Sequence, residues 1–553
     1  MLMNGVNDIL RRGILMFFVY VVLCAFPSRV EAVELVERSV VTDQGLYFWY
    51  PNGEKAYHYT ASISPRGDCY TVANGYIFFG WYKGGMDQRD LMISRKKIGS
   101  GKWVTVQLPH RNTLIGPGSR WGESHNTITV GVSTKDATIH IFYDHHNDPL
   151  KYIVSKKGTA FGPDRDFKVD IFEPTRGYLA EGEPIRITYP KVTENGLGDL
   201  IVNYRRGSAI GGNEMVHVYD GNAWSRAKQV TRGSDKTIPE AMKNYAYSAA
   251  PVFAGGNIYY AFSVRWKRKK ADNVLNEGVY LAKCGPTMTD DWEDPTGQKH
   301  SLPIEDYSPF LVADPRTSGG RGSSSSPSLA VSDQGDIVLG FRGRGRGAED
   351  DYTYMRQAGQ QNFEEYKGPV NMGHFWGDRM YAADRSSNGK ITVKSMRLGD
   401  KKWKEELAVD TGIRFGSAVV KLIDGMLVVI VEDRGDTKTD AQKIHCFAFK
   451  VGEPRVLSHD VPRVKRVLTR RDDGNQVEVE LVSLKHGRLT CFARGRRFVI
   501  PVRLDLHALD AAEFFHPRGS RKLHLGEVWR RSYGGSRLCG LGSATLEEEE
   551  KTA

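Results

Sequence analysis

Short runs of alternating apolar and polar residues, each closed by a turn that contains glycine, recur along residues 40–455. Examples are ATIHIFYDH, GNIYYAFSVRW and GDIVLGFRGRG, which are rich in β-branched and aromatic residues and have the period-two pattern of a strand. Long stretches with helical periodicity are hard to find. The pattern therefore predicts an all-β chain of many short strands.

An aromatic motif repeats within this pattern: an apolar strand, a short turn, and an aromatic residue that begins the next strand. Its copies recur at intervals of 40 to 71 residues and end at Trp103, Phe161, Trp224, Trp292, Phe363 and Trp403. Four short strands per repeat of this size are typical of one blade of a β-propeller, and a single blade cannot bury both of its faces. Six copies and a closing strand pair near Lys443–Lys450 predict about seven blades across residues 40–455. Two unrelated β-sandwiches are the alternative.

The first 32 residues follow a different pattern. Arg11 and Arg12 precede an apolar run from Gly13 to Phe26, and small residues around Ala32 offer a cleavage site. This is the layout of a signal peptide, and the run is too short to cross about 30 Å of hydrocarbon as a helix. We expect a signal peptide over residues 1–32, export to the periplasm or the medium, and no transmembrane segment after cleavage. An uncleaved anchor is the alternative.

After about residue 455 the strand rhythm changes to short strands broken by Asp-Gly, His-Gly and Arg-Gly turns. Residues 462–516 resemble the small SH3-like β-barrel module that is appended to secreted bacterial proteins. The resemblance implies an accessory or attachment role. Residues 534–553, which end in an acidic run, are expected to be disordered.

Composition and charge narrow the classes of partner. The chain has 553 residues, of which 40% are hydrophobic and 10% aromatic, which excludes a disordered protein. The net charge of +11 suggests an acidic partner, but residues 455–537 alone hold 18 Lys and Arg against 9 Asp and Glu. The propeller is therefore close to neutral. Its basic run FRGRGRG is interpreted as a turn or as part of a rim that faces a polyanion, and RWKRKK as a solvated loop, with contact to a sulfated sugar as the alternative, so no nucleic-acid partner is expected.

Cysteines give no sign of a metal centre. Removal of the signal peptide leaves five of the six cysteines, an odd number, and none has the spacing of a zinc site. They are interpreted as buried small residues. A structural calcium or zinc ion stays open, without evident ligands, and the oligomeric state is unknown.

Polar residues gather at the ends of neighbouring predicted strands. His125 opens a strand after a polar turn, and His145 and His146 end the next one. Tyr189 and Arg205 take comparable edges of the following predicted blade. Taken singly, a histidine or a strand tyrosine is more often structural, but their recurrence at equivalent edges favours a shared site.

Tyr247 extends this set to one further blade. Because loops at one end of a propeller converge on a central funnel, residues far apart in sequence can meet there. Histidine, tyrosine and arginine together form a general acid–base set with a cationic clamp.

The segments SHNTITV, HIFYDHHNDPLKY, TYP, VNYRRGSAIGG and NYAYSAAP resemble the BNR-type β-propeller polysaccharide lyases. These are the ulvan lyases of polysaccharide lyase families 24 and 25 and related rhamnose–glucuronate lyases. The resemblance covers roughly residues 45–450, and DHHNDPLKY is its most specific part.

The resemblance implies roles for individual residues. It implies that His125 and His146 lie near the scissile bond, that Tyr189 gives or takes a proton, and that Arg205 binds the uronate carboxylate. It also implies that Tyr247 lies in a substrate subsite. Arg265, Asn126 and His145 are further candidates for substrate contact, although His145 lies outside the register of the family motif.

Three features depart from the family pattern. His125 is followed by Asn-Thr-Ile where the family often has proline, the turn after Arg205 is one residue longer, and Cys284 stands alone where some relatives have a Cys/His metal set. These departures bear on the metal and on substrate choice more than on the reaction class.

The chemistry also follows from the residue types. β-Elimination from a 4-linked uronate removes the C5 proton, which is poorly acidic while the carboxylate is ionised. A bidentate arginine can neutralise that carboxylate, a neutral histidine can take the proton, and a histidine or tyrosine can protonate the leaving oxygen. We therefore expect a secreted lyase that needs no cofactor and acts on a uronate-containing, ulvan-like glycan. His125 and Tyr189 are the leading candidates for base and acid, in either order, and His146 assists.

Two other functions stay open. A sialidase-like exo-glycosidase would share the propeller, but it needs a carboxylate pair or a Tyr/Glu nucleophile with several arginines, and the intact S-x-D-x-G-x-T-W box is lacking. A propeller that binds glycans without cleaving them is the other alternative.

Overall fold

The computed structural model describes residues 32–452, apart from some loops, and seven short strands between residues 467 and 545. The undescribed loop residues are 48–62, 86, 115–121, 124, 183–184, 208–211, 234–243, 267–275, 290, 316–321, 324–325, 344–350, 368–372, 401 and 435–440. Within the described part of the chain, no helix has the length and apolar character needed to cross a membrane.

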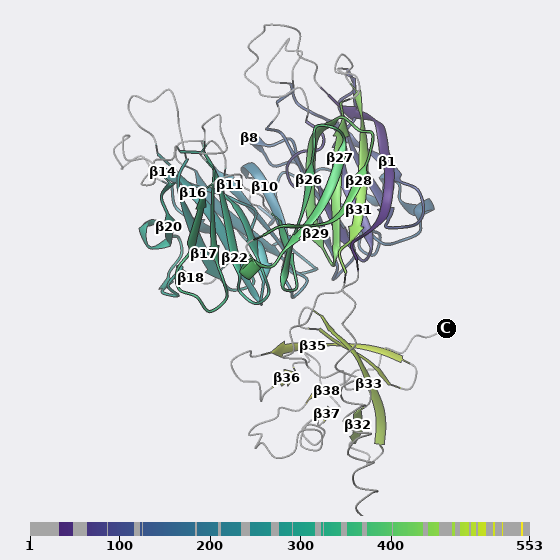
Figure 1. Ribbon diagram of the computed structural model, residues 1–553. Helices are drawn as coiled ribbons and strands as arrows, with labels where there is room; N and C mark the ends of the chain where they lie inside the picture. The colour runs from purple at the N-terminus through teal and green to yellow at the C-terminus, as the bar shows by residue number, and fades with distance from the viewer. Residues whose placement is uncertain are drawn as a thin grey trace, which may run out of the picture.

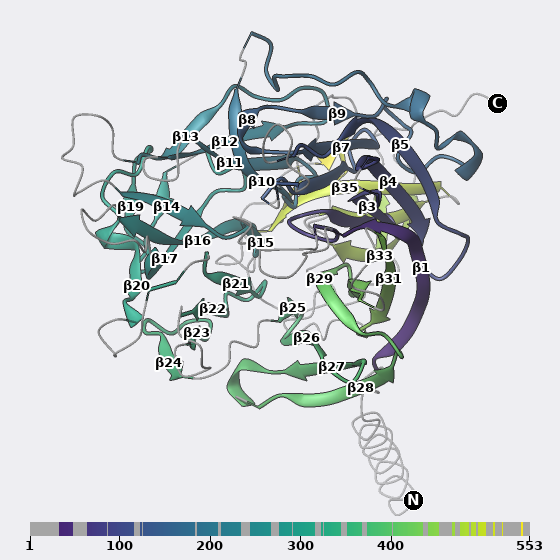
Figure 2. The same cartoon turned by 90° about the horizontal axis from the view of Figure 1, so that it is seen from above.

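Seven antiparallel sheets follow one another around a ring, as Figures 1 and 2 show. The first sheet contains β2 (Tyr70–Ala73), β3 (Tyr76–Tyr82), β4 (Asp90–Lys97) and β5 (Val104–Arg111). The second contains β6 (Ile128–Ser133), β7 (Thr138–Tyr143) and β9 (Tyr152–Val154). The third contains β8 (His146–Pro149), β10 (Arg186–Glu194), β11 (Leu200–Arg206), β12 (Asn213–Tyr219) and β13 (Lys228–Thr231).

The remaining four sheets complete the ring. The fourth contains β14 (Asn244–Ser248), β15 (Val252–Ala254), β16 (Asn257–Trp266), β17 (Asn276–Cys284), β18 (Trp292–Glu293), β19 (Lys299–His300) and β20 (Leu311–Ala313). The fifth contains β21 (Ser328–Val331), β22 (Ile337–Arg342), β23 (Asp351–Arg356) and β24 (Glu364–Lys367), and the sixth contains β25 (His374–Trp376), β26 (Arg379–Arg385), β27 (Lys390–Met396) and β28 (Lys404–Asp410). The seventh contains β29 (Phe415–Ile423), β30 (Met426–Asp433), β31 (Ala441–Lys450) and β1 (Glu34–Leu46).

The two ends of the propeller close the ring within the seventh sheet. β1 supplies the outermost strand and pairs antiparallel with β31, so that Arg38 lies opposite Phe447. Between the seventh and first sheets, the Tyr70 hydroxyl donates to the Val428 carbonyl at 2.8 Å, and the Lys421 ammonium donates to the Tyr70 carbonyl at 2.8 Å. The predicted all-β propeller of about seven blades is confirmed, and the two-sandwich alternative is wrong.

The aromatic motif marks one position in the blades. Trp103, Trp224, Phe363 and Trp403 lie directly before or near the start of β5, β13, β24 and β28, which are the outermost strands of their sheets, and Trp292 begins β18. Phe161 follows β9 and packs edge-on against Phe78 of the neighbouring blade, with 6.0 Å between ring centroids. The repeated aromatic residue therefore marks the segment that follows the third strand of a blade.

Neighbouring blades pack closely at the inner strands because two of these strands carry glycine. A Cβ atom on Gly80 would lie 2.6 Å from Ile128, and one on Gly131 would lie 2.6 Å from Val192, closer than carbon atoms pack. β3 is buried along almost its whole length, and its sequence is accordingly a nearly continuous run of apolar residues.

Strands β32 (Val467–Arg470), β33 (Gln476–Lys485), β34 (Arg488–Ala493), β35 (Arg496–Leu504) and β36 (Ala512–Phe514) form a five-stranded antiparallel sheet in this order, and β37 (Lys522–Leu523) pairs with β38 (Ala544–Thr545). Several short strands were predicted here, and the SH3-like assignment stays a prediction. The signal-peptide segment and almost all of the predicted disordered tail lie outside the described residues.

Candidate functional site

His125 lies in a tight turn just before β6, and the side chain of Glu123 braces that turn. The Glu123 Oε1 atom accepts hydrogen bonds from the His125 backbone N–H at 3.0 Å and from His125 Nδ1 at 2.5 Å. The Asn126 backbone N–H donates to the Glu123 carbonyl at 3.0 Å. The imidazole of His125 is therefore fixed in orientation while about a quarter of its side chain (23%) stays exposed.

His146 reaches the same place from a strand that leaves its own blade. β8 pairs with β10 of the next sheet and not with β7, and His146 lies opposite Thr188. The Asn147 N–H donates to Thr188 Oγ1 at 2.7 Å, which holds this crossing in place. As a result, the ring of His146 stacks on that of His125 with 4.4 Å between centroids.

Tyr189 is displaced from the regular ladder of β10 by a bulge. The register with β11 shifts between Thr188 and Lys191, and Tyr189 has a φ of +53°, which costs a residue with a side chain about 1–2 kcal/mol. Pro190 follows and has no N–H with which to restore the ladder. Bulges often redirect side chains beside active sites, and here the Tyr189 ring centre lies 5.9 Å from that of His146.

Burial raises the pKa of Tyr189 well above its ordinary value, and its hydrogen bond to Tyr247 adds to the effect. The guanidinium of Arg205 opposes this shift but does not reverse it. The phenol is therefore neutral at neutral pH and holds a proton that it can donate.

Arg205 is a buried cation surrounded by aromatic rings. Its side chain is 5% exposed, and its guanidinium carbon lies 5.4 Å from the ring centre of Tyr189 and 5.6 Å from that of Tyr245. Its Nη1 donates to the Tyr245 hydroxyl at 3.3 Å, whereas its buried Nε has no hydrogen-bond partner. Among the described residues, no carboxylate forms an ion pair with it. Glu214 lies opposite Arg205 in the β11–β12 ladder, but its carboxylate accepts a hydrogen bond from Ser248 at 2.9 Å. A buried cation that no ion pair compensates is costly, so this position is suited to an incoming carboxylate.

A second arginine continues the stack of rings. Arg265 lies opposite Tyr245 in the β14–β16 ladder, and its guanidinium carbon is 4.4 Å from the ring centre of Tyr247. Its Nε donates to Asn276 Oδ1 at 2.6 Å. Arg265 is therefore not part of a solvated loop, because it is the next-to-last residue of β16 and its side chain packs on tyrosine; its contact with substrate stays a prediction. Tyr247 also contacts Tyr189 edge-on at 6.2 Å, so both belong to one cluster.

Two expected substrate contacts are enclosed by the protein. Asn126 is 3% exposed and donates to Asp144 Oδ1 at 2.8 Å, and His145 is 1% exposed and accepts the Lys151 N–H on Nε2 at 2.8 Å. Burial lowers the pKa of His145 to about 3, so its ring is neutral. Both residues are therefore enclosed in this structure and support the strand end that carries His146, and their contact with substrate stays a prediction.

Asp144 is the centre of this support. Besides Asn126, it accepts hydrogen bonds from His110 Nε2 at 3.0 Å and from the Thr113 N–H at 3.1 Å. Burial alone would raise the pKa of Asp144, but these donors and Lys151 outweigh it and hold the pKa well below its usual range. The charged carboxylate thus anchors the strand end that carries His146.

Glu123 and Tyr245 belong to the site but were not singled out from the sequence. Tyr245 could have been found, because it precedes Tyr247 by two residues on the same strand and therefore shares its face. Glu123 precedes His125 by two residues in a turn, where no periodicity indicates which side chains meet.

Glu123, His125 and His146 also offer three donor atoms of the kinds that bind metals, and these atoms all lie within 4.8 Å of one another. Two tetrahedral ligands at about 2.0–2.1 Å from zinc lie about 3.3 Å apart. The 2.5 Å between Glu123 Oε1 and His125 Nδ1 is a hydrogen-bond distance instead. The donor set therefore fits a shared proton better than a metal, and the expectation that no cofactor is required stays a prediction.

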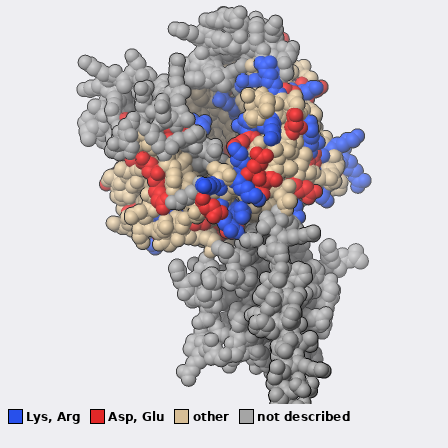
Figure 3. Space-filling model, viewed as in Figure 1, with Lys and Arg blue, Asp and Glu red and all other residues tan. Residues whose placement is uncertain are grey.

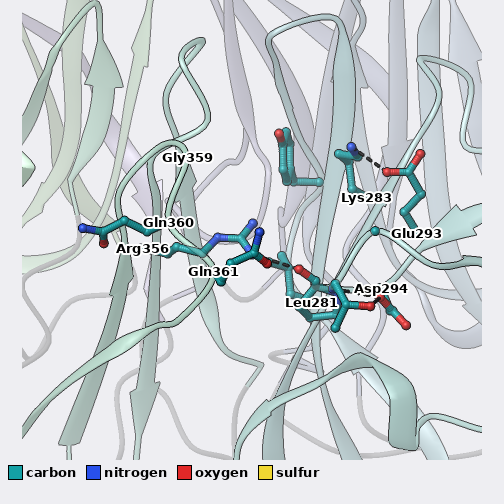
Figure 4. Close-up of a pocket in the computed structure, with 12 residues that line it drawn as sticks. Leu281, Lys283, Glu293, Asp294, Arg356, Gly359, Gln360 and Gln361 are labelled. Atoms are coloured by element: carbon teal, nitrogen blue, oxygen red, sulfur yellow. Dashed lines mark hydrogen bonds and ion pairs between the residues drawn. The ribbon is translucent and has the colours of Figure 1, made fainter.

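A separate cavity of about 240 Å³ lies between β17–β18 and β23 (Figure 4). Its charged groups are already engaged: Lys283 Nζ is 2.6 Å from Glu293 Oε2, and Arg356 donates to the Pro295 carbonyl at 3.0 Å and packs on Phe363. None of the predicted site residues lines it, so it is distinct from the histidine–tyrosine–arginine cluster.

Charges of both signs are interspersed over the described part of the face shown in Figure 3. This distribution agrees with the nearly neutral charge balance of the propeller. Selectivity for an anion must therefore come from individual cations such as Arg205 and Arg265.

Sequence relatives support the resemblance. The chain is 27% identical over 357 residues to the long isoform of ulvan lyase from Pseudoalteromonas sp. (strain PLSV), which covers 57% of this chain and 35% of that protein. It is 26% identical over 336 residues to the short isoform from Alteromonas sp. (strain LOR), which covers 52% of this chain and 63% of that protein. The chain thus spans about a third of the length of the long isoform.

Solved structures share the fold. The polysaccharide lyase Uly1 superposes with a TM-score of 0.64 at 23% identity and covers 76% of this chain and 100% of Uly1. A PL25 ulvan lyase bound to -[GlcA(1-4)Rha3S]- superposes with a TM-score of 0.51 at 14% identity and covers 76% of this chain and 96% of that chain. A family model described as a BNR repeat-containing family member matches residues 76–369, more than half of the sequence. The predicted resemblance is confirmed, and the chain belongs to the BNR repeat-containing family.

Proposed function

We propose that this protein is a polysaccharide lyase that cleaves a uronate-containing glycan by β-elimination. The observation that carries the proposal is Arg205, a buried guanidinium with no carboxylate partner among the described residues, beside Tyr189 and the stacked histidines. A uronate carboxylate placed there would satisfy the cation and bring its C5 proton to the histidines. The relatives named ulvan lyases support the same reaction class.

The proposed reaction starts with charge neutralisation. The guanidinium of Arg205 binds the uronate carboxylate in bidentate fashion, which makes the C5 proton more acidic and stabilises the charge that develops on the carboxylate oxygens. This interaction strengthens as the proton leaves, so it lowers the barrier and does not merely bind substrate.

In the proposed reaction His125 is the base and Tyr189 is the acid. His125 removes the C5 proton, because a neutral imidazole can accept a proton near neutral pH. As the C4–O bond breaks and the C4=C5 double bond forms, Tyr189 donates its proton to the leaving glycosidic oxygen. Tyr189 is suited to the acid role because its raised pKa keeps the phenol protonated. His146, stacked on His125 and beside Tyr189, supports the pair.

The proposed substrate is an ulvan-like polyanion. Both relatives are named ulvan lyases, and one neighbouring fold was solved with a glucuronate and sulfated rhamnose oligosaccharide. In this chain, Arg265 provides a second cation, which packs on the rings of Tyr245 and Tyr247. Its guanidinium is suited to bind a sulfate or a second uronate. We also propose that the chain is exported, on the pattern of its first 32 residues, and that the reaction needs no cofactor.

The test is the release of unsaturated uronate, followed by its ultraviolet absorbance, when purified protein meets a panel of sulfated and unsulfated uronate polymers that includes ulvan. His125→Ala serves as the inactive control, with thermal unfolding to confirm that it folds. Product from ulvan with wild type and not with the variant is the expected result. Folded wild type that yields no product from any uronate polymer would refute the proposal, and binding without turnover would indicate a glycan-binding propeller.

A further inference from the structure

We infer that Glu123 is a positioning residue for the proposed elimination: its carboxylate holds the Nδ1 proton of His125 and orients the His146 ring, so that Nε2 of His125 is the basic nitrogen. The inference rests on the proposed function. Glu123 itself never exchanges a proton with substrate, and it acts through the histidines.

The contact geometry singles out this carboxylate. Its Oε1 lies 2.5 Å from His125 Nδ1, and its Oε2 lies 3.5 Å from His146 Nδ1, so one carboxylate spans both rings. The side chain of Glu123 is 15% exposed, whereas those of His125 and His146 are 23% and 25% exposed. Glu123 is therefore the most enclosed of the three side chains.

Hydrogen-bond chemistry then fixes the tautomer of His125. An ionised carboxylate can only accept hydrogen bonds, so the nitrogen that contacts it must carry the proton. In neutral His125 the proton is on Nδ1, and the lone pair is on Nε2 at the far side of the ring. Burial would raise the pKa of Glu123, but hydrogen bonds from His125 and His146 outweigh it and hold the pKa well below the usual range, so the carboxylate stays ionised.

The stacking of the two rings limits how much positive charge the histidine pair can hold. With 4.4 Å between centroids, two imidazolium rings would repel each other, and a single carboxylate balances only one positive charge. When His125 takes the C5 proton on Nε2, the new imidazolium is compensated by Glu123 while His146 stays neutral.

Other charged and titratable groups face the pair from neighbouring strands. Tyr189 of β10 contacts both rings, and Arg205 of β11 lies behind it. Asp148 of β8 accepts the His146 backbone N–H at 3.0 Å. Arg66 interacts electrostatically with Tyr189. Glu123 is the carboxylate that meets both imidazoles directly, so its removal has the larger effect on their protonation.

The experiment compares Glu123→Gln with wild type, using Glu194→Gln as the matched control. Glu194 is at the exposed far end of β10 and binds Thr134 Oγ1 at 2.7 Å, far along the strand from the histidines. For each variant, kcat and KM are measured on ulvan across a range of pH, and thermal unfolding confirms the fold. Glu123→Asp, which keeps the charge, replaces Glu123→Gln should that variant fail to fold.

For Glu123→Gln we expect kcat to fall by roughly 10²-fold, the lower end of what proton transfer contributes, with little change in KM. The acid limb of the kcat profile should move to lower pH, because a protonated histidine loses its counter-charge. Glu123→Asp should recover part of kcat and the wild-type acid limb, and Glu194→Gln should match wild type. A Glu123→Gln profile with unchanged kcat and acid limb overturns the inference, as does activity that a chelator abolishes and zinc restores.

A second readout does not need lyase activity. Diethyl pyrocarbonate acylates unprotonated imidazole, and its rate of reaction across pH is compared between wild type, Glu123→Gln and His125→Ala. We expect the pH profile of the acylation rate to differ between wild type and Glu123→Gln. The difference should come from His125, whose contribution is missing in His125→Ala. If wild type cleaves no uronate polymer, the proposed function fails, and this measurement still decides whether Glu123 controls the protonation of the histidine pair; identical profiles in wild type and Glu123→Gln refute that control.

Discussion

Two clusters of histidine and tyrosine lie in neighbouring blades of the propeller, and their surroundings differ. In the first, His125, His146 and Tyr189 lie at the end of the ring with part of their surface exposed. In the second, His140 and Tyr152 lie inside the second blade, and His140 is fully buried. The residue types are the same, so the comparison isolates the effect of environment.

The buried cluster satisfies its own hydrogen bonds. Trp224 Nε1 donates to the Tyr152 hydroxyl at 3.0 Å, and that hydroxyl lies 2.7 Å from His140 Nδ1. His140 Nε2 lies 2.8 Å from Thr138 Oγ1, which in turn donates to Asp136 at 2.7 Å. Because Thr138 uses its proton on Asp136, it accepts from His140 Nε2, and His140 Nδ1 accepts from Tyr152. Every polar atom along this chain of contacts has a partner, which is typical of a structural role.

The exposed cluster is incomplete by contrast. The Arg205 Nε has no partner, Tyr189 is held in a backbone conformation that costs energy, and the two histidine side chains are each about a quarter exposed. Strain and unsatisfied groups cluster at functional sites because selection there is for chemistry and not for stability. Completeness of hydrogen bonding, and not residue type, therefore distinguishes the two clusters.

The largest expected effect is the loss of Arg205. In Arg205→Gln the uronate carboxylate loses its counter-charge, so we expect kcat/KM on ulvan to fall by about 10³-fold or more, beyond the cost of one neutral hydrogen-bond donor. Initial rates of unsaturated product formation measure it. Exposed Arg226→Gln is the control, and activity within a few-fold of wild type in Arg205→Gln would contradict the assignment.

Tyr189→Phe should have the next largest effect. The variant keeps the ring that packs on His146 but lacks the proton for the leaving oxygen, so we expect kcat to fall by roughly 10²-fold while the free energy of unfolding changes little. Denaturant unfolding and steady-state kinetics are measured on the same preparation. A variant that loses stability but retains kcat would show that Tyr189 has a structural role instead.

Tyr152→Phe should behave in the opposite way. Removing its hydroxyl leaves the buried Trp224 N–H and His140 Nδ1 unpaired, so we expect the free energy of unfolding to fall by about 1–3 kcal/mol. The kcat of the folded protein should match wild type. If kcat fell with the stability unchanged, the distinction between the two clusters would be lost.

The smallest expected effect is on the pH dependence of stability. Burial lowers the pKa of His140 from its ordinary 6.5 to about 3, so between these values the unfolded chain binds a proton that the folded chain does not. Stability from this residue is therefore present above pH 6.5 and is lost on acidification, by up to about 1.4 kcal/mol per pH unit. Thermal unfolding between pH 7 and 5 should show a shallower slope in His140→Gln than in wild type, and equal slopes would contradict the burial argument.

Much of the fold could be predicted from the sequence because its signals are local. Alternation along each strand recurs throughout the propeller, and an aromatic residue before the outermost strand, as at Trp103 and Trp403, recurs in several blades, so each copy reinforces the others. Tyr189 and Arg205 could likewise be assigned to facing strand edges, and the structure places Thr188 opposite Arg205. The burial of His145 and Asn126 could not be predicted, since a strand end shows no periodicity that separates buried from exposed side chains.

The sequence by itself therefore determined the propeller, its approximate number of blades and the residue types of the site. The tertiary structure decided how those residues meet. β8 crosses to the next blade and carries His146 onto His125, a bulge redirects Tyr189, and a turn places Glu123 beside the histidine pair. These three features depend on pairing between segments and on backbone conformations that local patterns do not encode, because each is stabilised by contacts with residues from other strands.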